Sequence, residues 1–102
     1  MSTYLDDDAA AIKSALDPGT EPPPNSDYLF VLYAVLMRAK GQDVSHSDVH
    51  DAWAAWMQLT APEHDAIKPF SQLDQKVQLE DEPYVTAIRK VAMSRAKANQ
   101  QY

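Results

Sequence analysis

Cysteine is absent from the sequence and glycine is nearly so, with Gly19 and Gly41 the only two in 102 residues. Without cysteine there can be no disulfide bond, no thiolate zinc site and no cysteine nucleophile, and this composition suits a reducing cytoplasm. Two separate glycines cannot build a glycine-rich phosphate loop, and neither Gly-x-Ser-x-Gly nor His-Glu-x-x-His occurs. These absences make catalysis the least favoured class, so we expect a non-catalytic protein that needs no cofactor.

Positive charge is also scarce, because 9 lysines and arginines stand against 15 aspartates and glutamates, a formal net charge of -6. We therefore expect no nucleic-acid partner and no anionic membrane partner, since both bind proteins largely through cationic side chains. The charges are unevenly spread, and the C-terminal residues 84–102 hold Arg89, Lys90, Arg95 and Lys97 without any acid. We interpret this basic segment as the solvated face of a helix.

Long hydrophobic runs are missing as well. The longest apolar stretch extends from Tyr28 to Met37, far short of the ~20 residues that a membrane-spanning helix needs. The first residues, "MSTYLDDD", lack the basic start and apolar core of a secretory signal. The sequence therefore predicts a protein without a membrane segment, located in the cytoplasm.

The spacing of apolar residues predicts helices, and the length fits a single domain over 1–102. Thr3 with Asp6 and Ser45 with Asp48 are typical of capping boxes, in which two residues bond each other's free backbone N–H groups at a helix start. The predicted elements are an N-terminal helix over 1–16, a proline-rich linker over 17–27, a central buried helix over 28–40, a tryptophan-containing helix over 46–60, a loop with a short helix over 61–80, and a C-terminal helix over 82–98.

The fold class that these elements predict is mainly α. We expect a compact single-domain bundle of four main helices with one or two short helices, and a minor β element near residues 66–68. The segment 28–40 is apolar on every side, so the other helices should cover most of its faces. Because four short helices offer limited cover, a homodimer is a further expectation.

The stretch "VHDAWAAW", Val49 to Trp56, is the first candidate for a functional site. Trp53 and Trp56 are three residues apart and therefore lie near the same side of a helix. We interpret Trp53 as an anchor in the core, because a tryptophan buries a large apolar area. Trp56 is placed nearer the edge of the apolar stripe, beside His50, where a planar ligand or a peptide could stack.

The three histidines raise two other hypotheses. His46, His50 and His64, with neighbouring carboxylates, could hold zinc or nickel, but their spacing lacks the tight grouping of structural zinc ligands, so we expect no metal site. An enzyme built on His50, Asp51 and His64 is the weakest functional hypothesis, since no known catalytic motif accompanies these residues.

The order of residues over 49–91 carries a family resemblance. His50 and Trp53 form a His-x-x-Trp pair, and the matching residues that follow are His64, Pro69, Phe70, Leu73, Lys76 and Asp81. This order resembles the ryanodine-receptor-type repeat, with Asp65 standing where that family has proline. The resemblance implies a mostly helical fold with short strands and a binding or scaffolding role without catalysis, and nucleotide-like ligands are suspected for some members.

The chain as a whole also resembles small uncharacterised actinobacterial and mycobacteriophage proteins, through "LYAVLMRAKG" at residues 32–41 and "VHDAWAAW" at residues 49–56. Two functions follow as expectations. The first is a small non-catalytic protein-interaction module, which in a phage would act on a bacterial host protein. The second is a domain that senses a nucleotide-like small molecule through a pocket like that of the repeat family. The candidate binding residues are His50, Trp53, Trp56, His64, Pro69 and Phe70.

Overall fold

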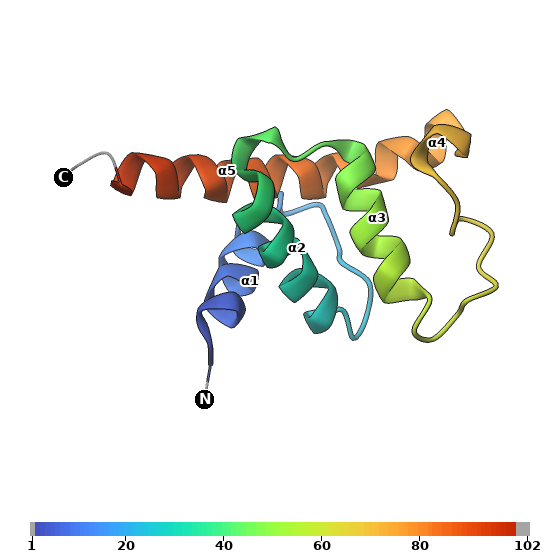
Figure 1. Cartoon of the computed structure of the whole chain (residues 1–102), viewed down its shortest axis with the longest axis horizontal. Coiled ribbons are helices and arrows are strands. Elements are labelled where there is room, and N and C mark those ends of the chain that lie inside the picture. Colours follow the sequence, from blue (N-terminus) through green and yellow to red (C-terminus); the bar gives the residue numbers. More distant parts are fainter. Residues whose placement is uncertain (1, 100–102) are drawn as a thin grey trace.

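The computed structural model describes residues 2–99, and helices account for most of them. The α-helices are α1 (Tyr4–Ser14), α2 (Asp27–Lys40), α3 (His46–Met57), the single turn α4 (Gln75–Gln78) and α5 (Glu82–Asn99). Three short 3-10 turns connect them, η1 (Gly41–Asp43), η2 (Phe70–Gln72) and η3 (Leu79–Asp81). In Figure 1, α5 lies along the long axis of the molecule, with α1, α2 and α3 against its length and α4 near its first turn. Within residues 2–99, no helix is both long enough and apolar enough to cross a membrane.

Two of the helix starts are held by the capping boxes that the sequence predicts. The Thr3 hydroxyl accepts a bond from the Asp6 N–H at 3.2 Å, and the Asp6 carboxylate accepts one from the Thr3 N–H at 2.9 Å. Ser45 and Asp48 do the same at the start of α3. These reciprocal bonds satisfy backbone donors that a helix start would otherwise leave free, and they fix where α1 and α3 begin.

The core forms around one broad face of α2. Leu29, Phe30, Tyr33, Ala34 and Met37 are buried there, at helical steps of one, three, one and three. They pack in one cluster with residues of α1, α3 and α5 and of the α2–α3 junction, among them Ile12, Val49, Ile88 and Val44. This arrangement confirms the mainly α bundle.

The helix α2 is buried on the face that packs into the core and exposed on its outer side. Tyr28 and Val35, seven residues apart on the outer side of α2, are 56% and 48% exposed. Among the described elements, α1, α3, α5 and the turn η1 pack against α2. The homodimer expected from the sequence stays a prediction. Sedimentation velocity at several concentrations, with Val35→Glu as the interface variant, would test it.

The minor β element expected near residues 66–68 does not form. The Ile67 N–H donates to the His64 carbonyl and the Lys68 N–H donates to the Ala66 carbonyl, both at 3.0 Å. These turn bonds use the backbone groups that a strand would need, and no strand lies beside the segment in the described part of the chain. The 58–69 loop instead leaves α3 and returns to η2 as a series of turns, visible as the long yellow stretch in Figure 1.

Asp8 has a different role from the one that its sequence context suggests. The acidic run at residues 6–8 suits the positive end of a helix dipole, but the Asp8 side chain is 1% exposed and lies between two arginines. Arg38 of α2 donates its Nε–H to Asp8 at 2.5 Å, and Arg95 of α5 forms the second ion pair. Asp8 therefore joins α1 to α2 and α5. Arg95 forms one of these two ion pairs and is also part of the exposed basic face.

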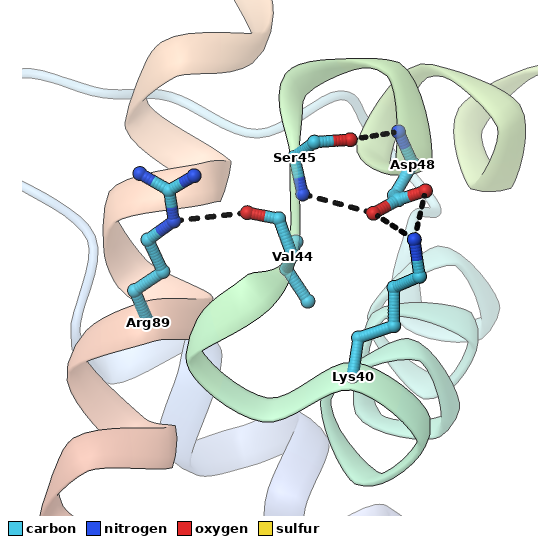
Figure 2. Close-up of polar contacts among 5 residues, drawn as sticks. All are labelled: Lys40, Val44, Ser45, Asp48 and Arg89. Carbon is cyan, nitrogen blue, oxygen red and sulfur yellow. Dashed lines mark hydrogen bonds and ion pairs between the residues drawn. The ribbon is translucent and has the colours of Figure 1, made fainter.

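The α2–α3 junction sets the direction in which α3 leaves the core. Gly41 has a φ of +58° and a ψ of -130°, a conformation that side chains strongly disfavour. Figure 2 shows the contacts that hold the turn: Arg89 of α5 donates to the Val44 carbonyl at 2.9 Å, and Lys40 bonds the Asp48 carboxylate at 3.0 Å. These contacts position α3, and with it His50 and Trp53, against the rest of the fold.

Candidate functional site

A cavity of about 460 Å³ lies where the proline-rich linker, α2, α3, the 58–69 loop, α4, η3 and α5 converge. This volume is within the range of pockets that take small molecules or single side chains of a partner. Its apolar wall consists of Pro23, Leu29, Ala66 and Val77. The remaining lining residues are aromatic, imidazole or acidic, so the chemistry of the cavity rests on these three classes.

The aromatic wall comes from three helices. Tyr33 of α2, Trp53 of α3 and Tyr84 of α5 line the cavity, and the Tyr33 and Tyr84 rings lie 5.6 Å apart at 39°. His50 stacks on Trp53 with ring centroids 5.6 Å apart and planes at 25°. Planar rings from several directions offer stacking surfaces for a flat or cationic group.

His50 is held in place by the 58–69 loop. The ring is 3% exposed, and its Nε2–H donates to the Lys68 carbonyl at 2.8 Å. That bond leaves Nδ1 directed toward Asp81, whose Oδ2 is 4.0 Å away. His64, on the same loop, meets the Trp53 ring edge to face at 5.2 Å and accepts a bond from the Ala66 N–H at 3.1 Å. The two histidines thus enclose the tryptophan.

Three carboxylates complete the cavity: Glu21 of the linker, and Glu80 and Asp81 of η3. Glu21 and Glu80 are exposed, whereas the Asp81 side chain is 14% exposed. Burial raises the pKa of Asp81 to about 6 against the lowering effect of His50 and His46, and the neighbouring Glu80 adds to the rise. Burial, with the negative charge of Asp81, also raises the pKa of Tyr84 and Tyr33. A carboxyl perturbed in this way inside a cavity is typical of a binding or catalytic position.

Comparison with known proteins identifies the family. The sequence profile of a domain of unknown function, DUF7701, matches residues 3–93, which is most of the chain. The chain belongs to the DUF7701 family. No curated protein and no solved structure is significantly similar to it. The DUF7701 profile carries no functional assignment, so the function has to be argued from the site.

Three of the six candidate residues of this DUF7701 domain line the cavity, namely His50, Trp53 and His64. Trp56 packs against the hydrophobic core and is not among the lining residues. Pro69 and Phe70 are also not among the lining residues. His50, Trp53 and His64, which the sequence puts forward on α3 and the loop after it, thus lie together on one wall of the cavity, and their role in binding stays a prediction.

Phe70 lies beside two of the histidines, His46 and His50. Its ring lies 6.3 Å from the His46 ring and 6.2 Å from the His50 ring, and its carbonyl accepts a bond from the Gln78 side chain at 2.9 Å. These contacts join η2 to both α3 and α4. Phe70 therefore contacts His50 without lining the cavity itself.

Sequence reasoning missed the opposite wall. Tyr33, Asp81 and Tyr84 come from α2, η3 and α5 and meet His50 only because these elements fold together. The sequence indicated Asp81 only through the resemblance to the ryanodine-receptor-type repeat, and it marked neither tyrosine as a site residue. One local signal was available. Asp81 and Tyr84 place polar groups on either side of Pro83, at the start of a helix whose inner face is otherwise predicted to be apolar.

The histidines do not assemble a metal site. Within residues 2–99, no three histidine, aspartate or glutamate side chains come together in a way that could hold a metal ion. His46 pairs with Glu82, His50 bonds the Lys68 carbonyl, and His64 faces Trp53. Each ring thus takes part in a separate contact.

Proposed function

We propose that this DUF7701 domain is a small non-catalytic module that binds another protein, and that the cavity beside Trp53 is the contact site. One observation carries the proposal: the cavity is built mainly from apolar and aromatic side chains, with a few polar groups at defined positions. That composition is typical of recognition pockets. The two exposed carboxylates at its border, Glu21 and Glu80, leave polar groups where a partner would approach.

The charge of the domain supports a protein partner. A formal net charge of -6 favours association with a basic protein surface, because complementary charge speeds encounter and disfavours wrong partners. The resemblance to actinobacterial and mycobacteriophage proteins directs the search to actinobacterial cytoplasmic proteins. A phage-encoded protein of this kind would act on a protein of its bacterial host.

The non-catalytic part of the proposal rests on the side chains at the cavity. No serine, threonine or lysine lines it within the described residues, so three of the common nucleophiles of covalent catalysis are absent from the cavity wall. Asp51, which the enzyme hypothesis combined with His50 and His64, is exposed and lies outside the cavity wall.

A nucleotide-like ligand is the second candidate. The stacked His50 and Trp53 rings would suit a planar base, and the resemblance to the ryanodine-receptor-type repeat points the same way. Against it stand Glu21, Glu80 and Asp81, which would repel phosphate groups. A nucleoside and its triphosphate, compared by thermal shift, would separate these effects, because only a ligand that binds the folded state raises the melting temperature.

The protein-interaction proposal is tested by closing the cavity without removing any of its contacts. Ala66 lines the cavity on the 58–69 loop, so Ala66→Phe places a ring in the space. The matched control is Ala55→Phe on α3, where the same enlargement points to solvent. Both variants and the wild type would be used for affinity capture from an actinobacterial lysate, after circular dichroism has shown equal helix content.

The expected result is a partner that the wild type and Ala55→Phe retain and Ala66→Phe loses. Retention of the same partners by all three proteins would show that the cavity is not the contact site and would refute the proposal.

A further inference from the structure

Asp81 lacks the kind of partner that the other shielded carboxylates have. Among the described acidic residues, only Asp8, Asp48 and Asp81 are buried or partly buried. Asp8 is paired with two arginines, and Asp48 is paired with Lys40. Asp81 is paired with no lysine or arginine among the described residues; its ion-pair partner is the His50 ring, at 4.0 Å, and His46 also acts on its charge. A mostly buried carboxylate without a lysine or arginine partner is costly to keep, and that cost is offset if a cation arrives from outside.

The rest of the cavity has the same preference. Glu21 and Glu80 add two more carboxylates, and no lysine or arginine lines the cavity in the part of the chain that the structure describes. The rings of Tyr33, Trp53 and Tyr84 supply π faces, which attract cations. The site thus combines negative charge with aromatic walls. That combination favours a positively charged group and disfavours a phosphate.

The geometry points to the guanidinium of an arginine side chain, contributed by a basic segment of a partner protein, as the occupant of the cavity beside Asp81. An arginine fits better than a lysine, because its planar head stacks on aromatic rings and bonds a carboxylate through two N–H groups. The free amino acid is less suitable, since its own carboxylate would meet Glu21 and Glu80. This inference rests on the proposed function, because it names the chemistry of the partner at the same cavity.

The two tryptophans provide a reporter and a control in one molecule. Trp53 lines the cavity, whereas Trp56 packs against the core and is not part of the wall. These are the only tryptophans of the chain, so an ¹⁵N-labelled sample gives two indole N–H signals, which a Trp56→Phe variant assigns. The full chain would be titrated with N-acetyl-L-arginine amide and, separately, with the citrulline and lysine analogues.

We expect a saturable shift of the Trp53 indole signal with arginine, at a dissociation constant on the order of 1 mM, typical of weak binding. The Trp56 signal should stay in place. Citrulline has the same shape without the charge, so its affinity should fall about tenfold, and lysine should lie between the two. Equal binding of citrulline and arginine, or equal shifts of both indole signals, would overturn the inference.

Removal of the carboxylates tests the assigned contact. Asp81→Asn should weaken arginine binding about tenfold. The control Asp51→Asn removes one exposed charge from α3 outside the cavity and should leave the affinity unchanged. Glu80→Gln is a second variant at an exposed position, where the fold is not at risk, and should weaken binding by a smaller factor. Unchanged affinity in both Asp81→Asn and Glu80→Gln would exclude the cavity carboxylates as the cation site.

The two proposals fail in different ways. If arginine leaves Trp53 unshifted while Ala66→Phe still loses a captured protein, the interaction site stands and the arginine inference is wrong. If arginine binds but Ala66→Phe retains every captured protein, the cation site stands and the interaction proposal is wrong. If sedimentation finds a dimer that N-acetyl-L-arginine amide dissociates, the arginine comes from a second copy of this chain, and the assignment to a separate partner is overturned.

Discussion

His50 Nδ1 lies 4.0 Å from Asp81 Oδ2 while His50 Nε2–H donates to the Lys68 carbonyl at 2.8 Å. The Lys68 bond determines which ring nitrogen is available to Asp81. One histidine therefore connects the 58–69 loop to η3, and the carboxylate opposite it is kept largely out of water without a lysine or arginine. The His50–Asp81 pair therefore bears on the stability of the fold and on the binding proposed for the cavity.

Asp81→Asn should stabilise the protein at pH 7.5. Folding raises the pKa of Asp81 to about 6, chiefly through burial. His50 and His46 lower this pKa and Glu80 raises it. Tyr33 and Tyr84 are the other titratable groups that interact with Asp81. The folded state therefore binds the proton more tightly, and above this pKa the ionised carboxylate costs stability. Because one pKa unit corresponds to about 1.4 kcal/mol, asparagine should gain about 1–3 kcal/mol.

The sign of this effect is checked by its pH dependence. As the pH falls from 7 toward 4, wild-type Asp81 becomes protonated in the folded state and its cost disappears, so the advantage of Asp81→Asn should shrink. Urea unfolding at several pH values measures the difference. A constant difference across that range would mean that the ionisation of Asp81 is not its source.

Asp8→Asn should destabilise the protein by about 2 kcal/mol. The variant leaves Arg38 and Arg95 without the carboxylate that joins α1 to α2 and α5. The expected loss is below the 3–5 kcal/mol of a fully buried pair, because both arginine side chains are 44% exposed and regain water. Chemical unfolding measures the change. Asp17→Asn, an exposed carboxylate without these contacts, should change stability by less than about 0.5 kcal/mol.

His50→Phe should loosen the 58–69 loop while keeping the stack on Trp53. The phenyl ring replaces the imidazole in area but cannot donate to the Lys68 carbonyl, a loss worth about 1–2 kcal/mol. Hydrogen exchange should accelerate at Ile67 and Lys68, whose amides bond within the loop. The amides of α1 serve as the internal reference. Unchanged exchange in the loop would show that the His50 bond does not order it.

Gly41→Ala should destabilise the α2–α3 junction by about 1–3 kcal/mol. An added Cβ at Gly41 would meet no atom within 4 Å, so the cost comes from the positive φ of +58° alone. Gly19→Ala is the matched control, because its surroundings are equally open and its φ is not in the disfavoured range. The control should be neutral or slightly stabilising. Thermal unfolding of both variants compares them, and equal melting temperatures would contradict the conformational explanation.

The helices were predictable because their signals are local. Capping boxes at Thr3 and Ser45 and apolar steps along the chain placed each main helix within a few residues, although the N-terminal and tryptophan helices end at Ser14 and Met57 and not at 16 and 60. The prediction of a minor β element near residues 66–68 was wrong, because the backbone groups of this loop bond to one another in turns.

The candidate site was predictable only in part, because its two walls depend on different information. His50 and Trp53 lie one turn apart on α3 and His64 follows in the next loop, so sequence proximity indicated them together. Trp56 is one turn after Trp53 and Phe70 follows in η2, yet both lie outside the cavity wall, because the elements packed around α3 decide which side chains line the cavity.

The sequence by itself determined where the helices of this DUF7701 domain begin, which side of each is apolar, and which chemistries are excluded. These properties depend on backbone bonds and spacing within a few residues. Only the tertiary structure decided that Asp8 lies between Arg38 and Arg95 and that Asp81 lies opposite His50 without such a pair. The physical reason is that burial and charge pairing arise from residues far apart in the chain, which meet only when α5 packs across the other helices (Figure 1).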